Sequence, residues 1–87
     1  MTNQAEFAAA QARVKTLSKT PGAAVLLELY ALYKQGSLGD VRGDRPGLLD
    51  MMGRAKFDAW QKKAGMSEQE ARGAYIELVD ELLRTNT

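Results

Sequence analysis

The sequence predicts an all-α fold, a four-helix bundle with a long loop between the second and third helices. Four segments carry apolar residues at helical spacing, and no segment alternates apolar and polar residues convincingly enough to indicate a strand. With 87 residues, a single domain spanning 1–87 is expected. A chain of this size buries only roughly 60–65% of its unfolded surface, so a ligand is expected in a groove or shallow bowl.

The first helix is expected from about Asn3 to Leu17. Phe7, Ala10 and Val14 lead to Leu17 at spacings of i, i+3, i+7 and i+10, which places all four on one stripe of a helix. The alanines between these positions favour a helix further.

The second helix is expected to begin at Thr20 and to end at Gly36. Thr20 suits an N-cap, and Pro21 suits the first helical position, where its missing N–H costs nothing. Gly36 suits a C-terminal stop in the left-handed conformation. The spacing gives this helix one face with Val25, Leu29 and Leu32 and another face with Leu26, Tyr30, Tyr33 and Lys34.

Residues 37–49 break all periodicity with three glycines, one proline and four charges, so an ordered loop is expected there. A loop of this length in a small domain is more often functional than idle. The third helix is expected from about Asp50 to Lys63, with Gly65 ending it. The length of the loop predicts that this helix crosses the others instead of lying beside the second.

The fourth helix has the strongest start signal in the chain. Ser67 and Glu70 have the spacing of a capping box, in which each residue satisfies a backbone N–H of the other. The helix that follows has an apolar stripe of Ala71, Tyr75, Leu78 and Leu82, widened by Ile76, Val79 and Leu83.

Composition favours a binding protein over an enzyme. The chain has no cysteine, which excludes disulfides and thiolate chemistry, and no histidine, the commonest general base and metal ligand. No pair of carboxylates lies on an apolar helical face, as acid–base catalysis would require. Neither catalytic residues, nor a metal, nor a cofactor are therefore expected, and an enzyme such as a thioesterase is disfavoured.

Charge and hydropathy restrict the partners. Residues 1–67 carry a charge of +4 and residues 68–87 a charge of −3, which is too weak an asymmetry for a general nucleic-acid binder. No apolar run approaches the ~20 residues of a membrane span, so stable membrane insertion is not expected. The N-terminus lacks the basic start and apolar block of a secretory signal, and a cytoplasmic protein is predicted.

Tyr30, Tyr33 and Lys34 project together from the second helix because they are three and four residues apart. A tyrosine buries its ring while its hydroxyl reaches a partner, and a lysine adds a mobile positive charge. Phosphate suits such a surface, since each charge-assisted hydrogen bond contributes roughly 1.5–3 kcal/mol. The alternative is that both tyrosines are half-buried core residues and the lysine is solvated.

Lys56 and Tyr75 extend this set. Lys56 shares a helical face with Met52 and Ala59, so its charge lies beside apolar surface, which suits a ligand with an acidic head and an apolar part. Arg54 lies off that face and is expected to be solvated. Tyr75 is either a core residue or a ring on which a base stacks.

Residues 30–60, YALYKQGSLGDVRGDRPGLLDMMGRAKFDAW, closely resemble the acyl-CoA-binding protein family. The shared signature is Y-x-x-Y-K-Q-x-x-x-G-D, then R-P-G-hydrophobic-L-D, then G-[KR]-A-K-[WF]-x-A-W. QAEFAAAQARVKTL near the N-terminus and AYIELVDEL in the fourth helix also match, so the resemblance spans about the whole chain. Gln35 and Asp40 belong to the signature and are expected to be structural.

The resemblance implies an up-down-down-up bundle that binds medium- and long-chain acyl-CoA esters without catalysis. Carried over by position, it implies that Tyr30, Lys34 and Lys56 hold the ribose 3′-phosphate, with Tyr33 beside them. It implies that Tyr75 lies against the adenine and that Lys15 reaches the polar part of the ligand. It also implies an acyl groove lined by Phe7, Ala10, Val14 and Leu26.

An intracellular carrier and buffer of acyl-CoA is therefore the expected function, with long-chain fatty acyl-CoA as the ligand. The carrier is expected to be a monomer that makes transient contacts with acyl-CoA-using enzymes. The alternative is a helical protein–protein interaction module that has lost ligand binding. Two positions depart from the family pattern, because Met52 stands where a lysine is common and Phe57 where a tryptophan is common.

Overall fold

The computed structural model describes residues 3–85, which form four α-helices and no strand. The helices are α1 (Gln4–Val14), α2 (Ala23–Leu38), α3 (Met51–Gln61) and α4 (Glu68–Thr85). The predicted all-α fold of four helices is confirmed, and so is the long loop between the second and third.

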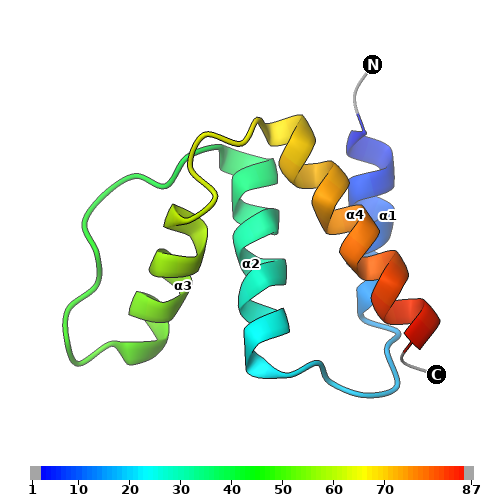
Figure 1. The fold of residues 1–87 in the computed structure, drawn as a ribbon, viewed down its shortest axis with the longest axis horizontal. Helices are drawn as coiled ribbons and strands as arrows, with labels where there is room; N and C mark the ends of the chain where they lie inside the picture. The colour runs from blue at the N-terminus through cyan, green and yellow to red at the C-terminus, as the bar shows by residue number, and fades with distance from the viewer. Residues whose placement is uncertain (1–2, 86–87) are drawn as a thin grey trace.

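The helices are arranged up-down-down-up. Figure 1 shows α1 and α4 running in one direction and α2 and α3 in the other. α2 packs against both α4 and α3, and α1 packs against α4. The result is a slab of 37 × 33 × 16 Å, so thin that binding surfaces lie at its faces.

α3 lies beside α2, so the predicted crossing over the other helices is wrong. Two parallel neighbours need a connection that travels back along the first helix. The 16 residues of α2 rise about 24 Å, and residues 39–50 are long enough to cover that distance in extended form. The long loop therefore serves a parallel pair, not a crossing.

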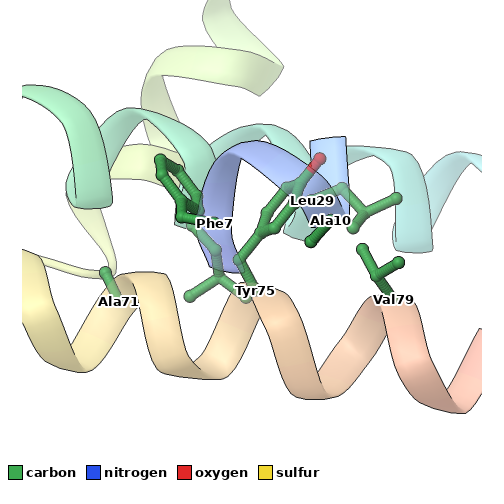
Figure 2. Close-up of a cluster of buried hydrophobic side chains, with 7 residues drawn as sticks. Phe7, Ala10, Leu29, Ala71, Tyr75 and Val79 are labelled. Atoms are coloured by element: carbon green, nitrogen blue, oxygen red, sulfur yellow. The ribbon is translucent and has the colours of Figure 1, made fainter. Parts of the chain in front are cut away.

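The hydrophobic core lies between α1, α2 and α4 (Figure 2). Its buried members are Phe7 and Ala10 of α1, Leu29 and Leu32 of α2, and Ala71, Tyr75 and Val79 of α4. These residues come from the predicted apolar stripes, which are confirmed as the buried faces. α3 contributes no buried residue, so apolar packing alone attaches it weakly to the rest of the fold.

A buried amide compensates for this weakness. The side chain of Gln35 is fully buried, and its Nε2 donates to Asp40 Oδ1 at 2.8 Å and to the carbonyl of Met66 at 2.9 Å. Its Oε1 accepts from Trp60 Nε1 at 3.1 Å. One side chain of α2 thus joins the loop, α3 and the start of α4. We call these three hydrogen bonds the Gln35 lock.

Asp40 and Trp60 each form one further hydrogen bond beside the Gln35 lock. Trp60 Nε1 also donates to the carbonyl of Gly39 at 2.8 Å, and Asp40 Oδ1 also accepts from the N–H of Gly65 at 2.9 Å. The hydrogen bonds from Gln35 and then Gly65 hold the pKa of Asp40 below its usual range. The expected structural roles of Gln35 and Asp40 are confirmed.

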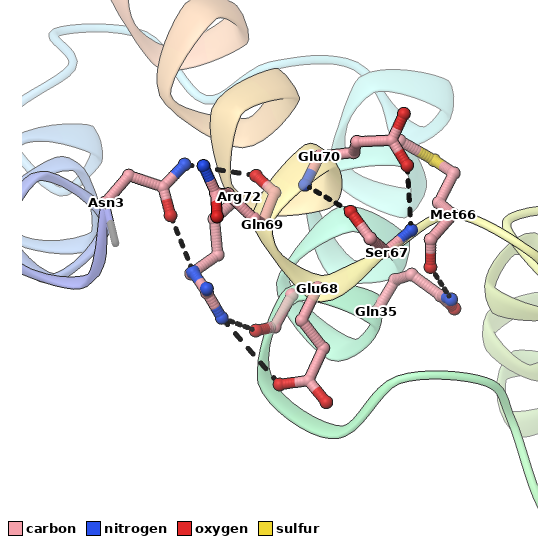
Figure 3. A network of polar contacts seen from close by, with 9 residues as sticks. Asn3, Gln35, Met66, Ser67, Glu68, Gln69, Glu70 and Arg72 are labelled. Atoms are coloured by element: carbon pink, nitrogen blue, oxygen red, sulfur yellow. Dashed lines mark hydrogen bonds and ion pairs between the residues drawn. The ribbon is translucent and has the colours of Figure 1, made fainter. Parts of the chain in front are cut away.

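The capping box at the start of α4 is confirmed (Figure 3). The N–H of Ser67 donates to Glu70 Oε1, and the N–H of Glu70 donates to Ser67 Oγ, both at 3.0 Å. Asp50 caps α3 in a similar way, because its Oδ1 accepts from the N–H of Gly53 at 2.9 Å. α3 ends at Gln61, before the expected Lys63, and turn residues lead to Gly65, whose φ is +93°.

The end of α1 and the start of α2 also differ from the prediction. α1 ends at Val14, and Leu17 lies in the turn that follows. α2 begins at Ala23 with Gly22 as its N-cap, so the start at Thr20 and Pro21 is wrong. Those two residues remain in the extended α1–α2 connection, which leaves them available to line a cavity described below.

The prediction that Gly36 ends α2 is wrong, because this glycine is buried within the helix. The last residue of α2 is Leu38, and Gly39 (φ +80°) follows it. A Cβ on Gly36 would lie 2.8 Å from Arg72 Cγ and 3.3 Å from Phe7 Cζ. The glycine is therefore required for the close approach of α4, not for a turn.

Arg72 is a buried cation that sequence reasoning missed. Its Nη1 donates to the carbonyl of Gly36 at 2.9 Å and its Nε donates to Asn3 Oδ1 at 2.7 Å (Figure 3). Asn3 Nδ2 in turn donates to the carbonyl of Gln69 at 3.0 Å. These bonds tie the start of α1 and the end of α2 to α4.

We predict that Gln35→Ala lowers the free energy of unfolding by about 2–4 kcal/mol, because it removes a buried amide that joins three segments. Urea denaturation followed by the fluorescence of Trp60 measures this change. Gln61→Ala, at an exposed position of α3, is the control and should cost less than about 0.5 kcal/mol. Equal stability of the two variants would contradict the Gln35 lock.

Gly36→Ala is expected to destabilise the fold by about 1–3 kcal/mol, although alanine has the higher helix propensity, because its methyl group collides with Arg72. Gly73→Ala is the matched control, since a Cβ there meets nothing nearer than 3.7 Å, and it should stabilise by about 0.5–1 kcal/mol. Calorimetric melting temperatures of both variants measure the difference. A more stable Gly36→Ala variant would show that the close approach is not limiting.

Candidate ligand-binding site

A cavity of about 540 Å³ opens between α1, α2, α4 and the α1–α2 connection. It brings together six of the residues predicted for a ligand site: Val14, Lys15, Leu26, Tyr30, Tyr33 and Tyr75. Five further residues line it: Leu17, Lys19, Thr20, Pro21 and Leu29. We call it the head cavity, because most of its polar groups are phenols and ammonium groups.

A groove of about 510 Å³ lies between α2 and α3. It is lined by Ala23, Leu26, Leu27, Tyr30, Met51, Met52, Ala55 and Lys56. All of these except Tyr30 and Lys56 are apolar, so we call it the apolar groove. Leu26 and Tyr30, one helical turn apart, line both spaces, which makes the head cavity and the apolar groove neighbours along α2.

Two ammonium groups flank the ring of Tyr30. Lys56 Nζ lies 5.3 Å and Lys34 Nζ 5.8 Å from its centroid, and Lys34 Nζ is also 5.4 Å from the ring of Trp60. These distances are within the range of cation–π attraction. The structure thus brings together Tyr30, Lys34 and Lys56 from two helices, and we call them the cationic cluster.

Three ammonium groups predicted for the site are available to an anion. Lys15, Lys34 and Lys56 form no ion pair with any residue in the described range 3–85. Lys34 is half-buried and Lys56 is exposed. A partly desolvated cation without a carboxylate partner attracts an anionic ligand more strongly than a paired cation does.

Aromatic rings connect the head cavity to the core. Phe7 stacks on Tyr33, with centroids 6.0 Å apart, and meets the edge of Tyr75 at 5.2 Å. Tyr33 is exposed, whereas Tyr75 is 5% exposed. Burial, with a smaller contribution from Tyr33, raises the pKa of the Tyr75 phenol above 10.0. At neutral pH its hydroxyl therefore keeps its proton and can serve as a hydrogen-bond donor.

Phe7 and Ala10 lie behind the head cavity and do not line it. Ala10 has no exposed surface and Phe7 is 7% exposed, because both belong to the core between α1 and α4. Their predicted place in an acyl groove stays a prediction. Sequence reasoning did not single out the contribution of Thr20 and Pro21, since an extended connection has no periodicity to indicate which residues face a cavity.

The arrangement suits a ligand that is anionic and aromatic at one end and apolar at the other. The cationic cluster and the phenols provide hydrogen bonds and stacking, and the apolar groove buries hydrocarbon. Within residues 3–85, no cluster of acidic side chains is disposed to hold a metal ion. Because the head cavity and the apolar groove share Leu26 and Tyr30, the geometry favours recognition of one bipartite ligand.

Comparison with known protein sequences relates this site to an established family. A family model described as Acyl CoA binding protein matches residues 4–79. An acyl-CoA-binding protein homolog of Manduca sexta is 51% identical over 84 residues, which cover 95% of this chain and 93% of the relative. Acyl-CoA-binding protein homolog 1 of Caenorhabditis elegans is 48% identical over 77 residues, covering 88% and 90% of the two chains.

Solved structures agree with the sequence comparison. The crystal structure of Oryza sativa acyl-CoA-binding protein 2 superposes with a TM-score of 0.90 at 40% identity, covering 94% of this chain and 91% of that chain. The ACBP crystal structure from Moniliophthora perniciosa gives a TM-score of 0.88 at 37% identity, covering 95% and 82%. Sequence and fold therefore point to the same family.

Ionisation of Tyr75 is expected to destabilise the fold above pH 10. Because its pKa is raised, the native state keeps a proton that an unfolded tyrosine loses near pH 10.0. This contribution to stability is complete below pH 10 and is lost as the pH rises through the native pKa. Ultraviolet absorbance of tyrosinate in the wild type minus Tyr75→Phe measures the ionisation, and a difference midpoint at or below 10 would contradict the buried environment.

Proposed function

This chain belongs to the acyl-CoA-binding protein family, and we propose that it binds medium- and long-chain acyl-CoA esters as an intracellular carrier and buffer. The family is one of non-catalytic binding proteins. One observation carries the proposal: Tyr30 lines both the head cavity and the apolar groove, and the ammonium groups of Lys34 and Lys56 both lie within about 6 Å of its ring, although Lys34 lines neither space.

The cationic cluster is proposed to hold the ribose 3′-phosphate of CoA. CoA carries roughly four negative charges near neutral pH, about two of them on this phosphate monoester. Lys34 Nζ and Lys56 Nζ lie 5.8 and 5.3 Å from the centroid of the Tyr30 ring, and we place one phosphate beside the Tyr30 hydroxyl, where it would accept from all three. Each charge-assisted hydrogen bond contributes roughly 1.5–3 kcal/mol. Tyr33 stands beside this group, one helical turn from Tyr30 on α2.

The rest of the CoA head is proposed to occupy the head cavity. Tyr75 and Lys15 both line it, one from the core and the other from the end of α1. We place the adenine against Tyr75, whose neutral hydroxyl donates a hydrogen bond, and the polar chain of CoA near Lys15. Both assignments are those that the family resemblance implies, and the chemistry of the lining side chains supports them.

The acyl chain is proposed to extend along Val14, Leu26 and the apolar groove. Each buried methylene contributes roughly 0.8 kcal/mol, so about ten of them would contribute ~8 kcal/mol before ordering costs. Phe7 and Ala10 would support the wall of this path from the core. The phosphate contacts thus select CoA, and the tail sets the affinity differences between acyl lengths.

Burial of the acyl chain between protein and CoA would keep it out of membranes and shield the thioester from water. Within residues 3–85, no helix is long and apolar enough to cross a bilayer. The cytoplasmic location, the monomeric state and the transient contacts with acyl-CoA-using enzymes stay predictions.

Calorimetric titration with palmitoyl-CoA, octanoyl-CoA and free CoA tests the function. We expect the dissociation constant to fall steeply from free CoA to octanoyl-CoA and again to palmitoyl-CoA, because each added methylene in the groove contributes up to about fourfold in affinity. Similar weak affinity for all three ligands would reject the proposal and favour a protein–protein interaction module. A thioester hydrolysis assay on the same samples tests the absence of catalysis.

Lys56→Ala is expected to weaken palmitoyl-CoA binding about tenfold to a hundredfold, since it removes a charge-assisted hydrogen bond to phosphate. Tyr30→Phe removes one hydroxyl and should weaken binding about tenfold or less. Neither change should alter the melting temperature appreciably, because both groups lie at the surface of the site. Lys62→Ala is the control, because Lys62 is an exposed lysine at the C-cap of α3 that lines neither the head cavity nor the apolar groove.

Unchanged affinity in Lys56→Ala would show that the 3′-phosphate is bound elsewhere. Equal weakening in Lys56→Ala and Lys62→Ala would show that only the overall charge of α3 matters.

A further inference from the structure

Two leucines occupy the corner of a tight turn just before α3. The N–H of Asp50 donates to the carbonyl of Gly47 at 3.0 Å, so Leu48 and Leu49 are the two central residues of the turn. Leu48 is 80% exposed and Leu49 102% exposed. Turn centres are normally polar or glycine, because they project into water. A pair of leucines there indicates a surface that meets something apolar.

The exposed apolar surface continues into α3. Met51 is 78% exposed and Met52 is 65% exposed, and we call Leu48, Leu49, Met51 and Met52 the apolar corner. Asp50 holds this corner in shape by capping α3 through the N–H of Gly53 at 2.9 Å. In Figure 1 the turn between the loop and α3 lies at the edge of the slab farthest from α4. Its exposed side chains and its place at the edge of the molecule suit insertion into a soft surface.

A cation with an unused donor adjoins the apolar corner. Arg54 lines a surface depression together with Leu48 and Met51, and its buried Nε finds no acceptor in the described part of the chain. Arg45, which lines the same depression, is already paired, because its Nε and Nη2 donate to Asp58 at 2.8 and 2.7 Å. Arg54 itself is half-buried and forms no ion pair within residues 3–85, so the accessible part of its guanidinium is suited to an external oxyanion such as a phosphodiester.

The charge distribution favours one orientation toward an anionic surface. Residues 68–87, most of them in α4, carry a charge of −3, whereas residues 1–67 carry +4. The carboxylates nearest to the apolar corner in sequence are Asp44 and Asp50, and Asp50 is engaged as the cap of α3. An anionic surface would therefore repel α4, and the guanidinium of Arg54 would favour contact through α3.

We propose that the apolar corner docks reversibly on the surface of a phospholipid bilayer, with Leu48 and Leu49 inserted at the acyl–headgroup boundary and Arg54 on a lipid phosphate. An apolar tip beside a cation matches the layered chemistry of that boundary. Four side chains bind weakly and reversibly, which agrees with a carrier that leaves the membrane again.

Docking has a consequence that rests on the acyl-CoA function proposed above. Met51 and Met52 belong both to the apolar corner and to the lining of the apolar groove. A bilayer in contact with the corner would therefore meet the groove at its α3 side. An acyl chain would pass between lipid and groove with less of its length exposed to water.

Flotation of the empty protein with vesicles tests the docking. The probes are vesicles of phosphatidylcholine alone and of phosphatidylcholine mixed with phosphatidylserine. We expect the wild type to float with the mixed vesicles and the double variant Leu48→Ser, Leu49→Ser to bind them at least about tenfold more weakly. Leu38→Ser, at a leucine of α2 that is 59% exposed outside the corner, should float like the wild type.

The arginine is tested in the same assay. Arg54→Gln should weaken binding to the mixed vesicles about fivefold, whereas Arg84→Gln in the last turn of α4 should leave it unchanged. Circular dichroism checks that each variant is folded, and Leu49→Ser alone replaces the double variant if that variant is not.

Three results would overturn the proposal: a wild type that floats with neither vesicle, a double variant that floats like the wild type, or a dimer in sedimentation that the double variant abolishes without any flotation. The last result would assign the corner to a second copy of the chain. Calorimetry with octanoyl-CoA separates the two proposals. If the wild type binds octanoyl-CoA but does not float with vesicles, the docking proposal is rejected and the acyl-CoA function stands. If it floats with vesicles but does not bind octanoyl-CoA, the acyl-CoA function is rejected and the docking proposal stands.

Discussion

The fold depends on one buried amide. α3 contributes no buried residue to the core, yet it carries Lys56, and the residue that Lys56 must accompany, Tyr30, belongs to α2. The Gln35 lock holds the two helices together, since Gln35 bonds to Trp60 of α3, to Asp40 of the loop and to the carbonyl of Met66. A site assembled from two helices therefore relies on a hydrogen-bonded connection where apolar packing is thin.

The same arrangement explains how a slab only 16 Å thick can serve a long ligand. A deep pocket would remove core from a domain that has little to spare. Two open spaces on the surface, sharing Leu26 and Tyr30, avoid that cost and place cations beside apolar surface. The cationic side chains then select the ligand by its charge. The apolar side chains contribute affinity separately, because they bury its hydrocarbon.

Local signals in the sequence predicted what local physics determines. The capping box of Ser67 and Glu70 and the apolar stripes of α2 and α4 require only neighbouring residues, and all three predictions are confirmed. The prediction for Gly36 is wrong because this glycine makes room for the side chain of Arg72, which lies 36 positions further along the chain. The length of the loop alone gives the wrong position of α3 for the same reason, whereas the up-down-down-up order that the family resemblance implies is confirmed. The parallel packing of α3 depends on the Gln35 lock, which no periodicity reveals.

The central claim is that one ligand spans the cationic cluster and the apolar groove. A crystal structure of the complex with palmitoyl-CoA tests it most directly. The account predicts the ribose 3′-phosphate within hydrogen-bonding distance of the Tyr30 hydroxyl and of Lys34 and Lys56 Nζ, with the acyl chain along Leu26 between α2 and α3. A ligand bound on another face, with these three groups still in water, would contradict it.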